Sequence, residues 1–486
     1  MVYLFLFALK EKRVLNIMKK TKIVTSIGPA SNTVEVFTKM VEAGANVARI
    51  NFSHATIEER EQAVSTVKKV REITGKNIAI LYDTKGPEFR SGVAQEEGIK
   101  LVAGNTIKLV KEDVVGTEEH LTFNHKSAID ALQVGNIVLL ENGLMSVEVI
   151  EKYDDYVVAK VINGGVLYSK KSCAVPGVDL HIPFISDVDR EDIIYACQHD
   201  GDYIAASFVQ TAEDVLAIRE ILKEQHREDM KIIAKIESQM GMDNLDAIAG
   251  VSDGLMVARG DLGVEVPFED LPLCQKRIVK TARRHRKICI VATEMLESMK
   301  HNPRPTRAEV TDVANAVLNG TDAVMLSGET TTGEYVVETV GAMARIAEHI
   351  ENSIEYKNVF ADNKVSTPTD AIIKSVAEAA NSLDVKLIVV PTVSGKSAKL
   401  ISNLEPSCPI LALVGDDETA NQLALNFGVY AVKVDIVNDM DELVNLSISE
   451  ARKFMDLKPG DNIIVTGGLV AGKIGFTNLM KIETIK

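Results

Sequence analysis

The stretch that decides the fold runs from Lys231 to Glu265 and reads KIIAKIESQMGMDNLDAIAGVSDGLMVARGDLGVE. It contains two short apolar runs, and charged residues stand at the end of each. The first run ends at Lys235 and Glu237, and the second ends at Asp261. Side chains two apart in a strand share a face, so the first two point the same way. Charges seldom stay unpaired at buried strand ends, so these carboxylates indicate a divalent metal, Mg²⁺ or Mn²⁺, with the lysine beside it for an anion. The alternative is a salt-bridged barrel mouth without a metal.

The same strand-then-helix pattern repeats along the chain. Eight β-branched apolar runs alternate with amphipathic helical patterns, and eight is the count of a (β/α)8 TIM barrel. An open doubly wound sheet could use the same alternation, but it would gather its ligands at one switch point. Here every run ends in polar residues, as barrel active sites require, so the barrel is favoured. The runs are 22–25, 46–50, 78–82, 203–206, 231–234, 254–257, 288–291 and 323–326.

Two further segments do not follow the barrel pattern. One lies between the third and fourth runs and contains turn-punctuated, strand-like pieces such as GNTIKLV, so we expect a small β-barrel domain that can act as a lid. The other follows the eighth run, where strand-like pieces such as KLIVVP alternate with helices, so we expect an open α/β regulatory domain. The expected segments are 18–87 with 184–352 for the barrel, 88–183 for the insert and 353–486 for the regulatory domain.

Residues 1–17 form a separate N-terminal extension in this interpretation. The sequence from Met18 resembles a natural beginning, so the preceding residues are interpreted as a misassigned start or a disordered tail. A cryptic signal peptide is the lesser alternative, because the positive cluster follows the apolar run instead of preceding it. The apolar run MVYLFLFAL is also far shorter than a membrane span.

Composition narrows the class of protein. The chain has 486 residues, 46% hydrophobic and 25% charged, which is ordinary for a globular enzyme of more than one domain. Its net charge of −15 argues against a nucleic-acid partner, which usually meets a basic face. Five scattered cysteines contain no CxxC pair, so neither a zinc site nor a disulfide framework is indicated. We therefore expect a cytoplasmic protein with no nucleic-acid or membrane partner.

Longer motifs then identify a family. The chain after Met18 resembles the pyruvate kinases through KIVTSIGPAS, ARINFSHA, DTKGPEFR, IIAKIES, MVARGDLGVE, VATEMLESM and DAVMLSGET, in family order and spacing. The resemblance implies phosphoryl transfer from phosphoenolpyruvate to ADP in the last step of glycolysis, giving pyruvate and ATP. It also implies a divalent cation, K⁺ and a homotetramer.

Two rival hypotheses accompany this interpretation. One is a catalytically silent effector-binding protein on the same fold, against which the intact Lys235, Glu237, Asp261 and Thr293 argue. The other is a different phosphoenolpyruvate- or pyruvate-using barrel, such as an aldolase or lyase. The long insert, the DTKGPEFR segment and the C-terminal domain argue against that second hypothesis.

The resemblance assigns catalytic and substrate-binding roles. Lys235 would stabilise the charge of the transferring phosphoryl group, and Arg49 would bind the substrate phosphate with its donor fork. The backbone amides of Gly260 and Asp261 open a helix and would receive the substrate carboxylate. Thr293 would line the substrate methylene and help to relay a proton, with a plain strand-end cap as the alternative.

The monovalent-cation site is also implied by the resemblance. A large ion of single charge suits mixed oxygen ligands better than a second Mg²⁺ does. In the family, a Glu at the position of Glu88 accompanies a K⁺ requirement. The implied K⁺ ligands are Asn51, Ser53, Asp83 and the carbonyl of Thr84.

The nucleotide phosphates would be met by residues of the barrel and the insert. The implied nucleotide-binding residues are Asn51, His54, Arg90 and Lys171, and Lys170 could exchange roles with Lys171.

A last motif lies in the C-terminal domain. PTVSGKSAKL contains GKS, but Val390 stands where a nucleotide-binding P-loop needs glycine. The loop instead matches the family's site for the phosphate of an activator, and hydroxyls with backbone amides around a glycine can form an anion nest. An ordinary helix N-terminus is the alternative. The partner loop GGLVAGKIGFTN leaves open whether a sugar phosphate or AMP binds. The implied effector residues are Thr392, Ser394, Gly395 and Ser397.

Overall fold

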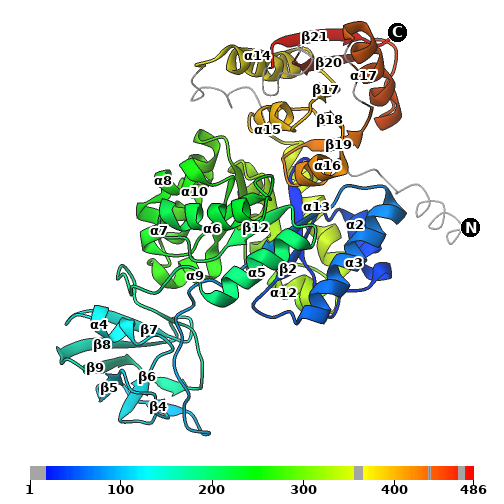
Figure 1. Cartoon of the computed structure of the whole chain (residues 1–486). Coiled ribbons are helices and arrows are strands. Elements are labelled where there is room, and N and C mark those ends of the chain that lie inside the picture. The colour runs from blue at the N-terminus through cyan, green and yellow to red at the C-terminus, as the bar shows by residue number, and fades with distance from the viewer. Residues whose placement is uncertain (1–17, 355–364, 436, 438, 469–476) are drawn as a thin grey trace, which may run out of the picture. The chain divides into compact units, whose positions relative to one another are not determined.

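The computed structural model describes residues 18–354, 365–435, 437, 439–468 and 477–486. Its central feature is a closed parallel barrel of eight strands in the order β1-β16-β15-β14-β13-β12-β3-β2 (Figure 1). All eight runs expected from the sequence are strands of this barrel, which confirms the TIM-barrel prediction. The barrel strands are β1 Lys22–Ser26, β2 Val47–Asn51, β3 Ala79–Asp83, β12 Tyr203–Ala206, β13 Lys231–Ile236, β14 Gly254–Ala258, β15 Ile288–Ala292 and β16 Ala323–Leu326.

The barrel strands are apolar because both their faces are covered, as in other parallel sheets. Strands β3, β12, β14 and β15 are buried along their whole length. Helices follow the strands, and several of them start with a capping box. In this motif the N-cap Ser or Thr and an acidic residue three positions later each accept a backbone N–H of the other. The N-cap residues are Ser186, Thr211 and Thr306. The helices are α2 Val34–Ala43, α3 Ile57–Thr74, α5 Asp187–Gln198, α6 Ala212–Glu224, α7 Gln239–Asp243, α8 Leu245–Val251, α9 Arg259–Glu265, α10 Leu271–Arg284, α11 Arg307–Leu318, α12 Gly328–Thr331 and α13 Val336–Glu351, with the 3-10 turn η1 Glu297–Lys300.

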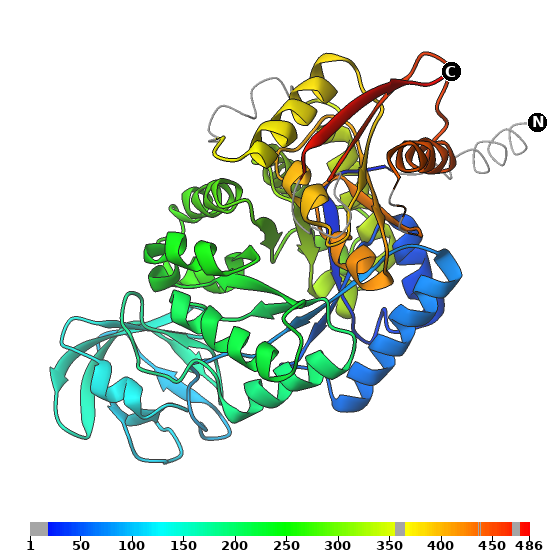
Figure 2. The same cartoon turned by 45° about the horizontal axis from the view of Figure 1, so that its top comes forward.

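The insert after β3 is built of strands, as expected, around its own apolar core (Figure 2). Its strands pair as a six-stranded sheet, β11-β7-β8-β9-β5-β6, and a two-stranded sheet, β10-β4, rather than as one closed ring. The elements are β4 Ile99–Leu101, β5 Thr106–Val110, β6 His120–Thr122, α4 Ser127–Ala131, β7 Ile137–Leu140, β8 Met145–Lys152, β9 Tyr156–Asn163, β10 Gly165–Leu167 and β11 Cys173–Ala174.

The C-terminal segment forms the expected open α/β sheet, with strand order β19-β18-β17-β20-β21. The edge strand β21 runs antiparallel to β20 and was not expected, because LMKIET alternates apolar and charged residues at the very end of the chain (Figure 2). The elements are α14 Pro368–Ser382, β17 Leu387–Pro391, α15 Lys396–Ser402, β18 Ile410–Val414, α16 Asp417–Leu423, β19 Val429–Lys433, α17 Met440–Phe454, β20 Asn462–Gly467 and β21 Leu479–Thr484.

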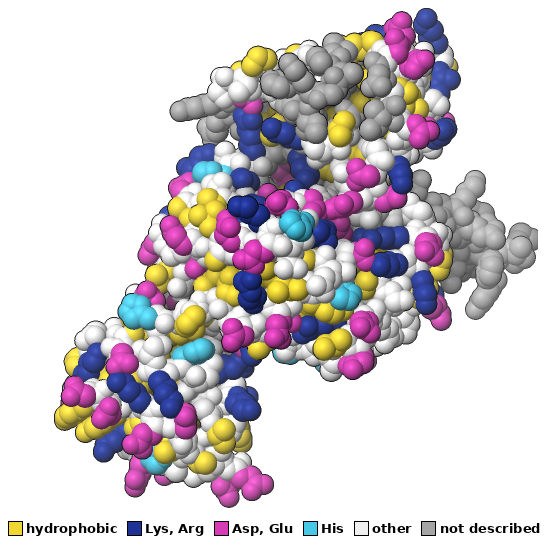
Figure 3. Space-filling model, viewed as in Figure 1, with side chains coloured by type: hydrophobic (Ala, Val, Ile, Leu, Met, Phe, Trp, Pro, Cys, Tyr) yellow, Lys and Arg dark blue, Asp and Glu magenta, His cyan; other side chains and the backbone are white. Residues whose placement is uncertain are grey.

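The chain divides into two compact units, and the candidate site lies within one of them. That unit comprises Arg49–Ser65 and Ile80–Glu294, and the other holds the remaining described residues. The N-terminal extension, residues 1–17, lies outside the described residues. None of the helices that the structure describes is long and apolar enough to span a bilayer. On the face drawn in Figure 3, acidic and basic side chains are interspersed over the described surface.

The other unit contains a buried charge cluster where the chain enters β1. The Glu351 carboxylate accepts the backbone N–H groups of Lys20 and Thr21, each at 2.7 Å. The ammonium of Lys22 donates to the carbonyl of Val429 in β19 at 2.6 Å. The ammonium of Lys19 donates to the Asn46 side chain at 2.5 Å. Burial lowers the pKa of Lys19 to about 7, although the Glu351 charge opposes that shift.

Candidate active site

Lys235 stands at the centre of the site. Its Nζ lies 2.7 Å from Ser207 Oγ, 3.1 Å from Asp83 Oδ1 and 3.1 Å from Glu237 Oε1. Burial lowers the pKa of Lys235, but the Asp83 and Glu237 carboxylates raise it by more, so the ammonium stays charged. The sequence placed three of these residues at strand ends, and the structure brings them together.

Arg49, in β2, joins the cluster through the same aspartate. Its Nε donates to Asp83 Oδ2 at 2.6 Å, so one carboxylate bridges Arg49 and Lys235. The Asp83 side chain is only 1% exposed. Burial alone would raise its pKa, yet the charges of Arg49 and Lys235 hold the pKa below its ordinary value. Two cations are thus fixed side by side at the barrel mouth.

The carboxylates of Glu237 and Asp261 are the candidate ligands of a divalent metal. Glu237 Oε2 accepts the backbone N–H of Phe208 at 2.6 Å. Burial raises the pKa of Glu237 to about 7, with the Asp261 charge acting in the same direction, and burial also raises the pKa of Asp261. Two buried carboxylates that repel each other fit a divalent cation, which relieves the repulsion. Among the described residues no group of three or more His, Cys, Asp or Glu side chains is arranged for a metal, so substrate and water would supply the other ligands.

Thr293 follows β15 with a backbone that is unusual for its residue type. Its φ is 68° and that of Glu294 is 51°, in the left-handed region that a β-branched residue rarely adopts. Arg259 holds this turn by donating to the carbonyl oxygens of Ala292 and Thr293. The Thr293 hydroxyl donates to the carbonyl of Ala292 at 2.6 Å. A strained residue fixed by several partners is typical of functional sites.

The backbone N–H of Gly260, which the sequence assigned to the substrate carboxylate, makes a hydrogen bond within the protein. It donates to Thr293 Oγ1 at 2.9 Å, so the donor predicted to receive a carboxylate already has a partner. The Thr293 hydroxyl thus accepts from the start of α9 and donates to the end of β15. A substrate carboxylate at this helix end would have to displace that hydroxyl or use the Asp261 amide.

Comparisons with known proteins identify the family of this chain. Residues 18–340 match the family described as pyruvate kinase, barrel domain, and residues 370–483 match its alpha/beta domain. This chain belongs to the pyruvate kinase family. A pyruvate kinase of Geobacillus stearothermophilus is 44% identical over 472 residues, covering 96% of this chain and 80% of that protein. One of Clostridium acetobutylicum is 39% identical over 475 residues, covering 96% of this chain and 100% of that protein. A crystal structure of a pyruvate kinase from Cryptosporidium parvum superposes with a TM-score of 0.92 at 36% identity and covers 96% of each chain.

The family gives the chain its activity, which is phosphotransfer between phosphoenolpyruvate and ADP, and implies a divalent cation and potassium. The comparisons give no support to the silent effector-binding alternative.

The residues expected to hold potassium lie on two neighbouring turns of this pyruvate kinase fold. Asn51 Oδ1 accepts the backbone N–H of Ser53 at 3.0 Å. The carbonyl of Thr84, beside Asp83, accepts the Ser207 hydroxyl at 2.7 Å. These oxygen atoms are a donor set that suits a monovalent cation.

Arg60 secures the first of these turns. Its guanidinium donates to the carbonyl oxygens of Phe52 and Ala55, each at 3.0 Å, and to Asp192 Oδ1 at 2.7 Å. The Arg60 side chain is 12% exposed and that of Asp192 is 9% exposed. Sequence reasoning missed this role, because a lone arginine on a helix is usually an exposed side chain.

A glycine makes the second turn possible. Gly86 has φ 67°, and a Cβ there would lie 2.8 Å from the Ser207 carbonyl oxygen. Its N–H also donates to Asp189 Oδ1 at 2.9 Å. The chain can therefore leave β3 for the insert only where a residue without a side chain stands.

The cations expected to meet the nucleotide are paired with carboxylates. Arg90 donates two hydrogen bonds to Glu88, each at 2.9 Å. Lys171 lies 2.7 Å from Glu141 Oε1. The His54 side chain is exposed beside the β2 turn. The structure brings Arg90 and Lys171 to one edge of the insert through the Arg90–Ser172 bridge. The His54 side chain makes no hydrogen bond or ion pair with another side chain among the described residues.

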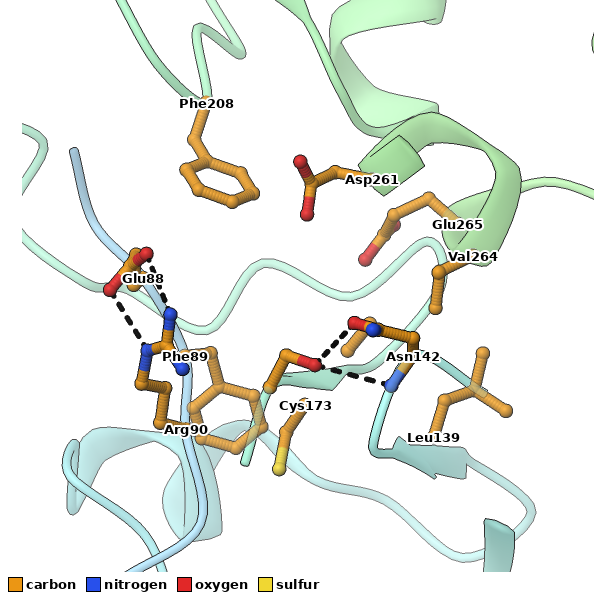
Figure 4. Close-up of a pocket in the computed structure, with 12 residues that line it drawn as sticks. Glu88, Phe89, Arg90, Leu139, Asn142, Cys173, Phe208, Asp261, Val264 and Glu265 are labelled. Atoms are coloured by element: carbon orange, nitrogen blue, oxygen red, sulfur yellow. Dashed lines mark hydrogen bonds and ion pairs between the residues drawn. The ribbon is translucent and has the colours of Figure 1, made fainter. Parts of the chain in front are cut away.

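A pocket lies between this edge and α9. Figure 4 shows the carboxylates of Asp261 and Glu265 reaching into it from α9, with the Glu88–Arg90 pair and Asn142 across from them. Burial raises the pKa of Glu265 to about 7. The pocket thus combines a candidate metal ligand with a candidate phosphate ligand. Its other lining residues are Phe89, Leu139, Ser172, Cys173, Ala174, Phe208 and Val264.

The expected effector loop precedes α15. Gly395 has φ 70° and caps the helix, and the Ser397 hydroxyl lies 2.7 Å from that of Thr477. Ser394 is exposed, and the N–H of Thr392 donates to the Leu413 carbonyl at 2.9 Å. Most of the partner loop, residues 469–476, lies outside the described residues.

Proposed function

We propose that this chain performs the family reaction at the cluster around Lys235. The P–O bond to the enol oxygen of phosphoenolpyruvate breaks, a P–O bond to the terminal phosphate of ADP forms, and the enolate takes a proton at its methylene carbon. The supporting observation is the fixed pair of cations, Lys235 and Arg49, held by the single carboxylate of Asp83. Phosphoryl transfer needs preorganised positive charge around the moving group, and this pair supplies it.

The cations of the reaction would be held by oxygen ligands already near Lys235. Glu237 and Asp261 would hold Mg²⁺ or Mn²⁺, and Asn51, Ser53, Asp83 and the Thr84 carbonyl would hold K⁺. When bound, the divalent ion neutralises charge on the phosphoryl group and the enolate. The residues themselves orient the substrate: Arg49 binds its phosphate, and the α9 start at Gly260 and Asp261 faces its carboxylate.

Thr293 is the proposed proton-relay residue. Its hydroxyl bridges the Gly260 amide and the Ala292 carbonyl, and a substrate carboxylate that takes the Gly260 amide would release the hydroxyl for the relay. A hydroxyl next to the reacting carbon can pass a proton through one water molecule.

The remaining roles concern the nucleotide, the effector and assembly. His54, Arg90 and Lys171 would bind the ADP phosphates, with Asn51 nearby, and the insert would act as a lid. The Thr392, Ser394, Gly395 and Ser397 loop would bind the phosphate of a sugar-phosphate or AMP effector, and the chain would assemble as a homotetramer.

The test is the variant Lys235→Met. Phosphoryl transfer from phosphoenolpyruvate to ADP should fall by several orders of magnitude, whereas exchange of the pyruvate methyl protons with solvent, measured by NMR with Mg²⁺ and K⁺, should persist. Exchange depends on enolate stabilisation more than on phosphoryl charge. Lys231→Met, at the opposite end of β13, is the matched control and should retain both activities. Equal loss of both activities in Lys235→Met would overturn the assignment, and no turnover by the unaltered chain under any condition would favour the silent-binder alternative.

A further inference from the structure

Lys171 is held by a carboxylate that belongs to a different part of the insert. Its Nζ lies 2.7 Å from Glu141 Oε1, and the two side chains are 37% and 23% exposed. Glu141 follows β7, whereas Lys171 precedes β11. The pair is therefore open to solvent on one side, where a ligand could reach the lysine.

The backbone around Glu141 is shaped to present this carboxylate. Glu141 and Asn142 have φ values of 48° and 55°, in the left-handed region that a glutamate rarely adopts. The turn is fastened to the lysine-bearing segment at three points, all through Ser172. The Glu141 N–H donates to its carbonyl at 2.8 Å, the Asn142 N–H donates to its hydroxyl at 3.1 Å, and that hydroxyl donates to Asn142 Oδ1 at 2.5 Å. These bonds hold the Glu141 turn against the segment that carries Lys171.

We propose that Glu141 is a built-in competitor of the nucleotide phosphate for Lys171 and so sets the affinity for ADP and ATP. The inference rests on the proposed function, in which Lys171 binds a nucleotide phosphate. A phosphate that approaches Lys171 must replace the Glu141 contact and also meets its negative charge. Because Glu141 acts through Lys171 and touches no reacting atom, it is a tuning residue and not a catalytic one.

The direction and size of the effect follow from the exposure of the pair. A partly exposed ion pair contributes about 0.2–1 kcal/mol, which corresponds to a factor of about 1.4 to 5 in affinity. Removing the Glu141 charge should therefore lower the KM for ADP and the inhibition constant of ATP by a factor of about 1.4 to 5. The KM for phosphoenolpyruvate should not change, since Lys171 does not meet that substrate.

The experiment is a double-mutant cycle of Glu141→Gln and Lys171→Met, with Glu118→Gln as the matched control. Glu118 is an exposed carboxylate of the same insert, so its loss changes the net charge equally. We expect E141Q to lower both nucleotide constants, E118Q to leave them unchanged, and the E141Q effect to vanish in the K171M background. Should E141Q fold poorly, Glu141→Asp, which shortens the arm by one methylene, should shift both constants in the same direction by less.

The outcomes separate the two hypotheses. If K171M leaves the KM for ADP unchanged, Lys171 does not bind nucleotide and the underlying assignment fails. If K171M raises the KM for ADP but E141Q does not lower it, only the competitor role fails. A higher KM for ADP in E141Q would show that Glu141 orients Lys171 for the phosphate instead of competing with it. That result would overturn the proposal.

Discussion

Replacing Asp83 with Asn should destabilise the unit that carries the site by about 3–5 kcal/mol, the cost of removing one partner from a buried ion pair. Asp83 is 1% exposed and accepts from Arg49 at 2.6 Å, from Lys235 at 3.1 Å and from the Ser207 hydroxyl at 3.2 Å. Hydrogen bonds to charged groups contribute about 1.5–3 kcal/mol each. Asparagine keeps one acceptor oxygen but turns an N–H₂ group toward the second cation, so two buried cations lose their shared counter-charge.

Urea unfolding followed by far-UV circular dichroism and tyrosine fluorescence measures this change, since the chain has no tryptophan. The two signals must be compared, because a protein with two units need not unfold in one step. The matched control is Asp113→Asn, whose partner Lys126 is exposed, and it should cost about 0.5 kcal/mol or less. A loss below about 1 kcal/mol in D83N would refute the reasoning.

Two further measurements sharpen the Asp83 prediction. Arg49 and Lys235 hold the pKa of Asp83 below its value in the unfolded chain. The ionised Asp83 therefore stabilises the fold above the unfolded pKa, and this stabilisation is lost as the pH falls through the folded pKa. The difference between the unaltered chain and D83N should therefore shrink as the pH falls below about 4. Inorganic phosphate should stabilise D83N more than the unaltered chain, because an anion can replace the missing charge.

Two other perturbations test the same physical picture away from Lys235. Lys19 has a pKa of about 7 in the folded state and about 10.4 in the unfolded state. Between these two pH values the unfolded state binds one more proton than the folded state. The free energy of unfolding should therefore rise with pH by up to about 1.4 kcal/mol per pH unit. Lys19→Met should remove that slope in urea unfolding at several pH values, and an unchanged slope would contradict the assignment. Arg60→Met should raise the K⁺ concentration for half-maximal activity by about tenfold or more, because Arg60 holds the turn that carries Asn51 and Ser53. The Mg²⁺ concentration for half-maximal activity should not change. An equal rise in the K⁺ and Mg²⁺ concentrations would indicate a general loss of order in the barrel.

The barrel was predictable from the sequence because its strands are buried on both faces. Runs such as Tyr203–Ala206 and Ala323–Leu326 contain little but apolar residues, so their short length and polar boundaries identify them. The edge strand Leu479–Thr484 was missed because one side of it carries Lys481 and Glu483. An exposed edge gives a strand no continuous apolar run to recognise.

The site was predictable in part. Position at strand ends sufficed to bring Lys235 and Glu237 together, since all strands of a parallel barrel end on one face. Arg49 was assigned through the family resemblance. The hydrogen-bond partners were not predictable, because they depend on side-chain direction and on local φ values. The Gly260 amide illustrates this, because the left-handed turn at Thr293 aims a hydroxyl at it that no spacing reveals.

The partners that sequence could not show give the site a common feature. Four of the candidate phosphate-binding cations touch a carboxylate: Arg49 and Lys235 touch Asp83, Arg90 touches Glu88 and Lys171 touches Glu141. Arg49 and Lys235 are largely buried and need such a partner, because an unpaired buried charge would cost several kcal/mol of folding free energy. Arg90 and Lys171 are partly exposed, so their pairs are weaker. An anionic substrate therefore binds by exchanging one ion pair for another, and its affinity is the difference between two similar energies. It follows that removing a carboxylate, and not only removing a cation, should change the affinity for an anionic substrate.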